Sequence, residues 1–333
     1  MRILLDSNKN YYKANLHCHT VYSDGTLTPE QIKQEYKARG YSAVAFTDHE
    51  HIINSSHLTD ESFVAITGCE LAIKECPAGS TLKNANMKAT HLCLWAKDEK
   101  AELTPCYSTL ADHFINDAVK DRIKADGDTP REYTAECIER IIDTAHRDGF
   151  LVCYNHPSWS LQDATDYPMH KGADFIEIFN TGSVKGGLYA DEAAFAEMLR
   201  LNPEILPVAT DDNHNRKPLD SPYSDSFGGF AMINAQSLGY SELMEALENG
   251  DFYASTGPSI SSLALDGRVV KIATSSVKKI SVISGGRPTR AKIAEAGEYI
   301  TEWELELPES FTGFRIRLDD GEGGVAYTRF YSL

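Results

Sequence analysis

Short β-rich runs alternate with longer helical segments along residues 1–257, and this alternation constrains the fold more than any other feature of the chain. Strands that alternate with helices form βαβ units, which assemble into a mostly parallel sheet. Seven such strands in one domain favour a closed (β/α) barrel over an open sheet. The expected strands are Ala14–Cys18, Ala43–Thr47, Phe63–Thr67, His91–Trp95, Leu151–Asn155, Phe175–Asn180 and Leu206–Thr210.

The helices between these strands are predicted from their end signals. Thr28-Pro29-Glu30-Gln31 combines an N-cap threonine, a proline at the first helical position and a capping-box glutamine. Thr129-Pro130-Arg131-Glu132 has the same device, and Gly40 and Gly149 are expected to end the two helices. Further helices are expected at Tyr107–Lys124, Gly187–Leu201 and Ser241–Glu248.

Beyond residue 258 the pattern changes to β-rich runs separated by turn signals such as Asp266-Gly267 and Gly285-Gly286. Residues 258–333 are therefore predicted to form a small antiparallel, β-sandwich-like domain after the barrel domain of residues 1–257. Thr256-Gly257-Pro258 marks the expected boundary. The expected strands of the second domain are Ser262–Leu265, Val269–Ala273, Lys279–Ile283, Tyr299–Leu307, Gly313–Leu318 and Val325–Tyr331.

The balance of charge limits the partners that the chain can bind. The 333 residues contain 32 Lys and Arg against 49 Asp and Glu, which gives a formal net charge of −17 at pH 7. Long nucleic acids and anionic membranes are bound through clustered cations, so we expect stable binding to neither. A small phosphorylated substrate can still bind if its site supplies positive charge.

Neither a membrane span nor a secretion signal is expected. No run approaches the roughly 20 apolar residues that a membrane span needs, and the apolar run after Met1-Arg2 is too short for a signal peptide. The seven cysteines form no CxxC pair and are odd in number. We therefore predict a cytoplasmic, reducing compartment, and the sequence leaves the oligomeric state open.

Histidines and carboxylates gather at or near the ends of the predicted strands. Because the carboxyl ends of parallel strands meet on one face of a barrel, these side chains are expected to share a pocket. Imidazole nitrogens together with carboxylate oxygens are typical ligands of zinc, manganese and iron. In His17-Cys18-His19 the two imidazoles fall on the same side of an extended chain, and Cys18 is directed into the core. The residues at these positions are His17, His19, His49, His91, His156, His214, Asp24, Asp48, Glu70 and Asp212.

The order of these residues resembles the motifs of the PHP (polymerase and histidinol phosphatase) family of metal-dependent phosphoesterases. Asn15-Leu16-His17-Cys18-His19-Thr20, followed by Ser23-Asp24-Gly25, is similar to the family's opening motif. Trp95 departs from the residues that are commoner after the fourth motif. The resemblance covers about residues 13–257, and its later motifs are Thr47-Asp48-His49, Gly68-Cys69-Glu70, His91-Leu92-Cys93-Leu94, Asn155-His156-Pro157 and Asp212-Asn213-His214.

The resemblance implies a distorted (β/α)7 barrel with two to three divalent metal ions (Zn, Mn or Fe), and a trinuclear site if every position is filled. Glu70 would bridge two ions, while Asp48 and Asp211 would orient imidazoles from outside the ligand set. Three divalent ions outweigh three carboxylates, so the site of an acidic protein would still attract phosphate. The implied ligand sets are His17, His19, Glu70 and Asp212 for one ion, Glu70, His91 and His156 for the second, and Asp24, His49 and His214 for the third.

The function that this resemblance implies is hydrolysis of a small phosphate ester, either a phosphomonoester or a short nucleotide, by a water that the metal ions activate. Asp48 is a candidate catalytic acid. Arg216 is a candidate phosphate contact, and a solvated loop arginine fits its position equally well. Glu177 interrupts an apolar strand, so it lies either at the barrel mouth as a substrate contact or in a structural ion pair.

Two other functions are compatible with such a barrel. A catalytically silent PHP-like binding domain typically lacks some ligands, whereas every ligand position is filled here. A metal-dependent amidohydrolase usually carries a carboxylated lysine, and no lysine stands among the expected ligands. His51 has a smaller chance of reaching the site, and His113, His146 and His170 are expected to be ordinary packed or solvated histidines.

Overall fold

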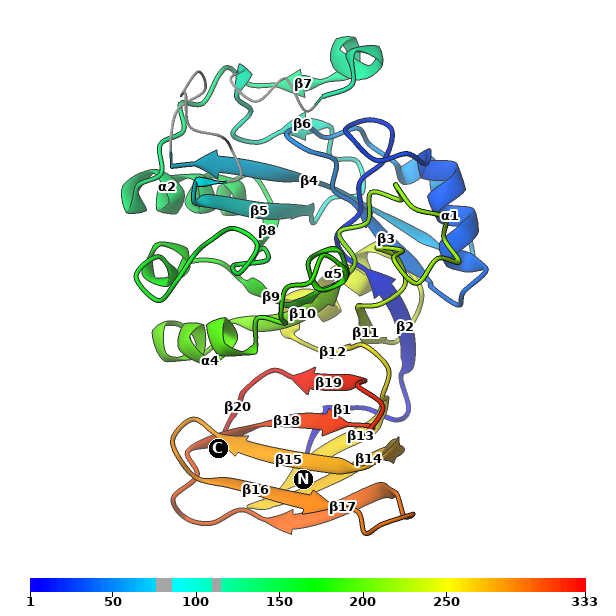
Figure 1. The fold of residues 1–333 in the computed structure, drawn as a ribbon, viewed down its shortest axis with the longest axis vertical. Coiled ribbons are helices and arrows are strands. Elements are labelled where there is room, and N and C mark those ends of the chain that lie inside the picture. Colours follow the sequence, from blue (N-terminus) through cyan, green and yellow to red (C-terminus); the bar gives the residue numbers. More distant parts are fainter. Residues whose placement is uncertain (76–85, 110–114) are drawn as a thin grey trace.

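The computed structural model describes residues 1–75, 86–109 and 115–333; Cys76 and His113 lie outside the described residues. It has a mixed α/β fold in which a strand overlaps each of the seven predicted runs. These strands are hydrogen-bonded neighbours in the order β10-β9-β8-β5-β4-β3-β2 and occupy the upper part of Figure 1. Their bounds are β2 Asn10–Asn15, β3 Ala43–Phe46, β4 Val64–Lys74, β5 Ala89–Ala96, β8 Phe150–Tyr154, β9 Phe175–Asn180 and β10 Leu206–Thr210.

The two ends of this seven-stranded series meet without a hydrogen-bonded ladder in the described part of the chain. An isolated parallel bridge between Cys18 and Asn213 links the segment after β2 to the segment after β10. Two backbone hydrogen bonds accompany it, from His19 to Asn213 (3.1 Å) and from Asp212 to His17 (3.0 Å). A closed barrel is therefore not established, although the carboxyl ends of its first and last strands lie side by side.

The direction of β5 differs from the mostly parallel sheet that the sequence predicts. β5 runs antiparallel to both of its neighbours, β4 and β8. Its amino end therefore lies where the carboxyl ends of the parallel strands lie. His91 is near the start of β5, and the reversal of this strand places it on the same face as the other predicted ligands.

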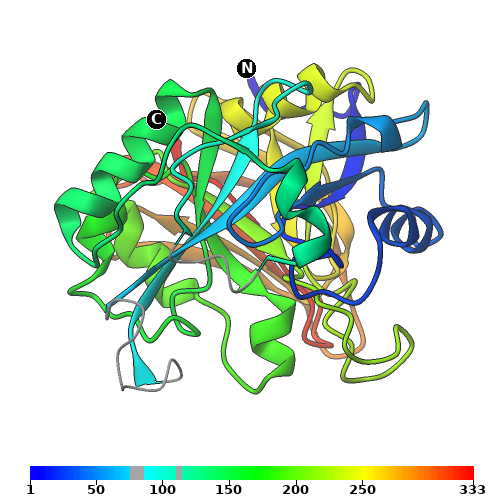
Figure 2. The same cartoon turned by 90° about the horizontal axis from the view of Figure 1, so that it is seen from above.

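Helices cover the outside of these strands, and Figure 2 shows α1 and α2 on opposite sides of the molecule. α1 (Pro29–Lys37) begins with the predicted capping box, in which Thr28 and Gln31 hydrogen-bond each other reciprocally. α2 (Ala135–Arg147) is capped by Thr134 and not by Thr129. The predicted start of this helix is therefore wrong, since the helix begins five positions later. Arg131 explains the difference, since its guanidinium forms a buried ion pair with Glu50 and holds this stretch as a loop.

The helix expected at Tyr107–Lys124 is also wrong where the structure describes it. The described part contains the 3-10 helix η4 (Asp117–Arg122), in which Val119 alone is buried. One buried side chain gives no apolar stripe that could hold an α-helix against the sheet. The remaining helices and short elements are α3 Thr181–Lys185, α4 Glu192–Leu201, α5 Tyr240–Asn249, η1 Ser56–Leu58, η5 Tyr167–His170, β6 Leu103–Thr104 and β7 Lys124–Ala125.

The C-terminal strands pack as two antiparallel sheets around their own core, which includes Leu263, Ile272, Phe314 and Ile316. β1, from the N-terminus, belongs to one of them because it pairs with β13, so both termini lie in the lower part of Figure 1. The other sheet continues the series of β2 to β10 through β11 and β12 to β19. The strands are β1 Arg2–Leu5, β11 Phe230–Ala235, β12 Phe252–Ser255, β13 Ile260–Asp266, β14 Val269–Val277, β15 Lys279–Ser284, β16 Thr289–Ile293, β17 Ile300–Glu306, β18 Gly313–Asp319, β19 Val325–Thr328 and β20 Tyr331–Ser332.

The division into domains at residue 258 stays a prediction. Two of the described strand pairs cross it, β1 with β13 and β12 with β19. Within the described residues, no helix is long and apolar enough to cross a membrane.

Candidate metal centre

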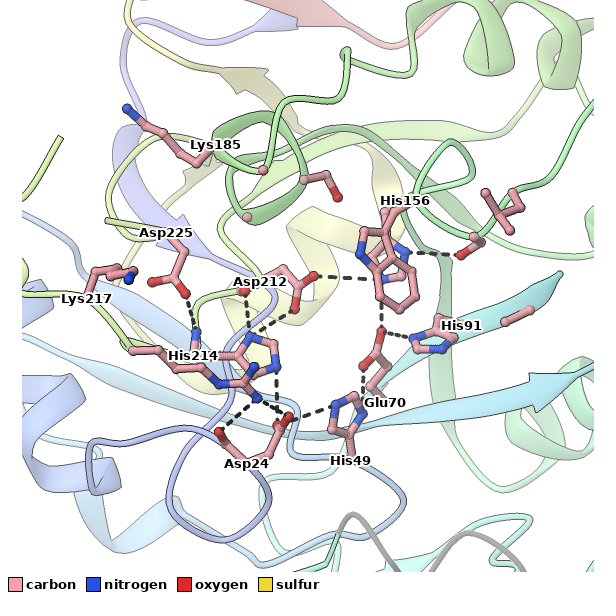
Figure 3. A pocket seen from close by; sticks show the side chains of 18 of the residues that line it. Asp24, His49, Glu70, His91, His156, Lys185, Asp212, His214, Lys217 and Asp225 are labelled. Atoms are coloured by element: carbon pink, nitrogen blue, oxygen red, sulfur yellow. Dashed lines mark hydrogen bonds and ion pairs between the residues drawn. The ribbon is translucent and has the colours of Figure 1, made fainter. Parts of the chain in front are cut away.

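The nine predicted metal ligands come together at one face of the strands, as Figure 3 shows for most of them. They lie after β2, β3, β8 and β10, within β4 and β5, and in the loop before α1. Three groups within them have nitrogen or oxygen atoms all within 4.8 Å of one another. These groups are His19 with Asp24, His49 and His214; His17 with Glu70 and His156; and His17 with His19 and Asp212.

Glu70 lies at the centre of the cluster, with its two carboxylate oxygens facing different histidines. Oε1 is 2.9 Å from His91 Nδ1 and 3.1 Å from His156 Nε2. Oε2 is 2.9 Å from His49 Nδ1. Glu70 therefore stands between the His91–His156 side and the His49 side of the centre, which Figure 3 shows as two neighbouring groups of side chains.

Asp212 faces the two histidines of the HxH segment. Its Oδ1 is 3.3 Å from His17 Nε2 and 3.0 Å from His19 Nε2, and the two Nε2 atoms are 3.1 Å apart. Asn180 donates a hydrogen bond from Nδ2 to Asp212 Oδ2 (3.2 Å) and so holds this carboxylate in place. Asn180 was missed from the sequence, although it ends a predicted strand as the ligands do.

The third side of the cluster contains Asp24, whose Oδ1 is 3.2 Å from His214 Nε2 and 3.5 Å from His49 Nε2. Its other oxygen, Oδ2, accepts a hydrogen bond from Arg216 Nη2 at 2.5 Å. Arg216 is 59% exposed. The structure thus places this candidate phosphate contact beside the cluster, with an ion pair to fix its position.

Charges within the cluster keep its carboxylates ionised. Burial would raise the pKa of Glu70, but His91 and His17 hold this pKa well below its usual value. Burial likewise opposes the low pKa of Asp212, which His17 and His19 maintain. Burial and the neighbouring His49 and His214 lower the pKa of His19 to about 4. His19 is therefore neutral at pH 7 and offers a lone pair.

The donor set fits divalent metal ions. The Nε2 atoms of His17 and His19 lie 3.1 Å apart. Two N–H groups cannot face each other at this distance, so at least one of the two Nε2 atoms presents a lone pair. His19 Nδ1 is buried and has no hydrogen-bond partner in the described structure. Buried imidazole and carboxylate groups that converge with unsatisfied lone pairs are typical of sites for zinc, manganese or iron.

Comparison with protein families adds an independent observation. Residues 15–145 match the model of the PHP domain family. This part of the chain is similar to a PHP domain. Six of the nine predicted ligands lie in the matched part, and the other three follow it; these are His156, Asp212 and His214.

A curated protein to which the chain is similar is a 5'-3' exoribonuclease from Haemophilus influenzae. It is 24% identical over 227 residues, which cover 52% of this chain and 81% of the relative. A solved structure from Bacteroides vulgatus, a two-domain protein containing a predicted PHP-like metal-dependent phosphoesterase, is 13% identical with a TM-score of 0.49 and covers 100% of this chain and 98% of that one. A candidate metal-dependent phosphoesterase from Bifidobacterium adolescentis is 18% identical with a TM-score of 0.41, over 62% of this chain and 89% of that one.

Glu177 lies beside the cluster and supports it through hydrogen bonds. Its Oε1 accepts hydrogen bonds from His17 Nδ1 (2.7 Å) and from Thr210 Oγ1 (2.6 Å), and its Oε2 accepts from the backbone N–H of His156 (3.0 Å). Glu177 is 1% exposed. Of the two positions that the sequence left open, these contacts correspond to pairing with an internal histidine. Such a carboxylate orients the imidazole and leaves its Nε2 free for a metal.

Asp48 and Asp211 hold loops near the cluster in place. Asp48 accepts hydrogen bonds from Thr20 and from Ser23, including Ser23 Oγ at 2.6 Å, in the loop that leads to Asp24. Asp211 accepts from Tyr36 OH (2.8 Å) and from the backbone N–H of residues 227 to 229. Their expected role of orienting imidazoles is not what these hydrogen bonds do.

The other predicted histidines have ordinary partners. The Nδ1 of buried His51 donates to the carbonyl of His49 (2.7 Å). His146 pairs with Asp174 (2.9 Å) on a half-buried surface, and buried His170 stacks on Tyr154 with ring centroids 3.9 Å apart. The packed or solvated positions predicted for His146 and His170 agree with these contacts.

A cavity of about 910 Å³ opens above the centre. Arg216 is in its lining, whereas Asp48 and Glu177 are not among the described residues that line it. The wall also contains Trp159, a residue that the sequence analysis did not single out although it stands three positions after His156. Figure 3 shows Lys185 and Lys217 at the His214 side of the cavity. Its lining comprises Asp24, His49, Glu70, Lys74, Met87, Ala89, His91, His156, Trp159, Ser160, Leu161, Gly182, Ser183, Lys185, Gly186, Asp212, His214, Arg216, Lys217, Tyr223 and Asp225.

Proposed function

We propose that this chain is a metal-dependent phosphoesterase that hydrolyses a small phosphate ester, a phosphomonoester or a short nucleotide, at a trinuclear centre. The observation that carries the proposal is the position of Glu70 between two sets of histidines, with each carboxylate oxygen facing its own set. This is the arrangement that a bridging carboxylate needs. When bound, divalent ions would supply a water of lowered pKa and neutralise the phosphoryl oxygens.

The proposed ligand sets follow the groups of neighbouring atoms. His91 and His156 share Glu70 Oε1, and His49, His214 and Asp24 surround the opposite side. His17, His19 and Asp212 form the remaining set with Glu70. Two to three ions of Zn, Mn or Fe would fit these mixed nitrogen and oxygen donors better than Mg or Ca.

The residues of the chain that act on the substrate are proposed from their positions around the cavity. Arg216 lines the cavity and is fixed by Asp24, so its remaining N–H groups can contact a phosphate. Glu177 would position His17 rather than touch the substrate. A catalytic role for Asp48 stays a prediction, because its hydrogen bonds to Thr20 and Ser23 favour a role in holding the loop of Asp24.

A nucleotide is the favoured substrate within this class. The exoribonuclease relative from Haemophilus influenzae acts, by its name, on RNA, which supports an ester that carries a nucleoside. The net charge of −17 disfavours long polyanions, because their distal phosphates would lie against a negative surface. Mononucleotides and very short nucleotides are therefore expected to be hydrolysed faster than a twenty-mer.

The proposal is tested with a substrate panel on the purified protein. The panel contains p-nitrophenyl phosphate, bis-p-nitrophenyl phosphate and an amide substrate, each with added Mn²⁺ or Zn²⁺ and with a strong chelator as the control. We expect hydrolysis of the monoester that the chelator abolishes and metal restores. Turnover of the amide alone would support the amidohydrolase function instead, and elemental analysis that finds neither bound metal nor uptake would contradict the metal centre.

A further inference from the structure

The cavity extends beyond the cluster of metal ligands into a wall of apolar side chains. Met87 and Ala89 are buried in this wall, whereas Trp159 and Leu161 are 51% and 49% exposed. Large apolar side chains that remain half exposed beside a polar centre mark a binding surface when they form one patch. This wall is continuous with the site because His91 and His156 line the same cavity.

Trp159 stands next to the side of the centre that contains His91 and His156. The centroid of its ring lies 5.3 Å from that of His91, with an interplanar angle of 60°. The corresponding values for His156 are 5.1 Å and 74°. The indole thus stands steeply to both imidazole rings, and half of its surface remains exposed at the cavity that it lines.

The loop that carries Trp159 is held rigidly. The N–H of Ser160 donates to the carbonyl of His156 (3.1 Å), and the carbonyl of Ser160 accepts from Ala89 (3.1 Å). Asp191 accepts hydrogen bonds from both the backbone N–H and the hydroxyl of Ser158. These hydrogen bonds hold the backbone on both sides of Trp159 in place, and a loop that is ordered before a ligand binds lowers the entropic cost of binding.

The backbone of this loop is strained in a way that keeps the apolar side chains at the cavity. His156 and Leu161 have φ values of +27° and +58°, in the left-handed region that residues with a Cβ rarely adopt. Such strain persists where the surrounding structure enforces it, and it clusters at functional sites. The loop thus combines strain, tight hydrogen bonding and exposed apolar surface at one edge of the proposed centre.

We infer that Trp159 is a specificity-determining residue that stacks on a planar ring in the organic part of the phosphate ester. This inference rests on the proposed phosphoesterase function and selects, within it, esters that carry a ring such as a nucleobase over aliphatic phosphates. An aromatic ring prefers an offset-stacked or edge-on partner, and stacking on a nucleobase tolerates every base because each has a π-face. An aliphatic phosphate offers no surface for this contact.

The test compares Trp159→Ala and Trp159→Phe with the wild type on a nucleoside monophosphate and on glycerol phosphate. We expect Trp159→Ala to raise KM for the nucleotide about tenfold, as the loss of one stacking contact does. KM for glycerol phosphate, kcat for both esters and the metal content should stay within twofold. Trp159→Phe should retain most of the affinity. Tyr189→Ala is the matched control, since Tyr189 is an exposed aromatic residue (88%) outside the cavity lining.

A second readout does not depend on turnover. Tryptophan fluorescence is titrated with a nucleoside phosphonate that cannot be hydrolysed, and a saturable change is expected in the wild type but not in Trp159→Ala. The other two tryptophans, fully buried Trp95 and Trp303 of β17, remain in both proteins as the background. Equal KM changes for both esters, an unchanged KM in Trp159→Ala, or loss of metal in that variant would overturn the inference. Hydrolysis of no ester at all would count against the proposed function, and the titration would still decide whether Trp159 contacts a ring.

Discussion

Both carboxylate oxygens of Glu70 face imidazoles, whereas Asp24 faces imidazoles with one oxygen and Arg216 with the other. This difference predicts unequal consequences for the two residues. A residue that bridges two ions affects both when it is lost, and a residue that serves one ion affects only that ion.

We expect Glu70→Gln to lower activity by more than about a hundredfold, beyond the range typical of residues that only support ligands. Asp24→Asn should lower activity less and should reduce the metal content by no more than about one ion per chain. Elemental analysis and kinetics on the two purified variants measure both effects. Equal small losses in the two variants would contradict the bridging position of Glu70.

Buried His170 predicts a pH-dependent contribution to stability that is independent of the metal centre. Burial lowers the pKa of His170 to about 3, although the hydrogen bond to the carbonyl of Asp166 opposes this shift. The neutral ring lies between Thr90 Oγ1 (2.9 Å) and that carbonyl (3.2 Å). In the unfolded chain the ordinary pKa is about 6.5. The contribution is therefore complete above pH 6.5 and is lost as the pH falls toward 3, since only the unfolded chain gains the proton in that window.

We expect the wild type to lose about 2 kcal/mol more of its free energy of unfolding than His170→Gln between pH 7.5 and pH 5. Urea unfolding of both proteins with chelator present measures this difference without a contribution from bound metal. Parallel pH profiles of the two proteins would show that His170 is not the group responsible.

At the scale of elements, the start of α2 shows how tertiary contacts select between two similar cap signals. Thr134 Oγ1 accepts a hydrogen bond from the backbone N–H of Cys137 (3.3 Å), while Thr129 lies in a loop whose backbone N–H donates to the carbonyl of Tyr107 (2.7 Å). The two threonines are five positions apart in the sequence, and Arg131, which lies between them, forms the buried ion pair with Glu50.

We expect Thr134→Ala to lower the free energy of unfolding by about 1 kcal/mol, the typical cost of removing an N-cap side chain. Thr129→Ala is the matched control and should change it by less than about 0.5 kcal/mol. Denaturant unfolding of the two variants under identical conditions measures the difference. A larger effect at Thr129 than at Thr134 would place the functional cap at the position that the sequence predicts.

At the scale of the whole molecule, α4 contacts both β9 and the C-terminal strands β18 and β19. Glu192 of α4 receives two hydrogen bonds from Arg317 of β18, at 3.0 Å and 3.1 Å, and one from the hydroxyl of Tyr327 in β19 (2.6 Å). Burial would raise the pKa of Glu192, but the hydrogen bonds from Arg317 and Tyr327 lower it. The carboxylate is therefore ionised and holds the two parts together.

We expect Arg317→Ala to lower the free energy of unfolding by about 1–3 kcal/mol, because it leaves Glu192 without its paired charge. Metal content should be unchanged, since Arg317 lies outside the ligand cluster. Arg290→Ala is the matched control, as Arg290 is exposed on the edge strand β16. Loss of metal in Arg317→Ala would show that the C-terminal sheets influence the centre directly.

Local signals in the sequence were sufficient to predict the seven runs that strands overlap and the start of α1. They were also sufficient to predict that His19, His49 and His214 lie close together, because parallel strands place their carboxyl ends on one face whatever the rest of the chain does. The reach of these signals is short: a cap or an alternating run depends on residues within a few positions of one another.

Only the tertiary structure determined the direction of β5, the partners of Glu177 and Asp48, and the pairing of β1 with β13. Each depends on contacts between segments that are distant in sequence, and no local pattern encodes such a contact. The direction of a strand is decided by the neighbour that satisfies its backbone hydrogen bonds. The position of a buried carboxylate is decided by the donors that surround it. The sequence by itself thus identified the residues that gather at the candidate metal centre, and the packing of distant segments decided which groups hold them in position.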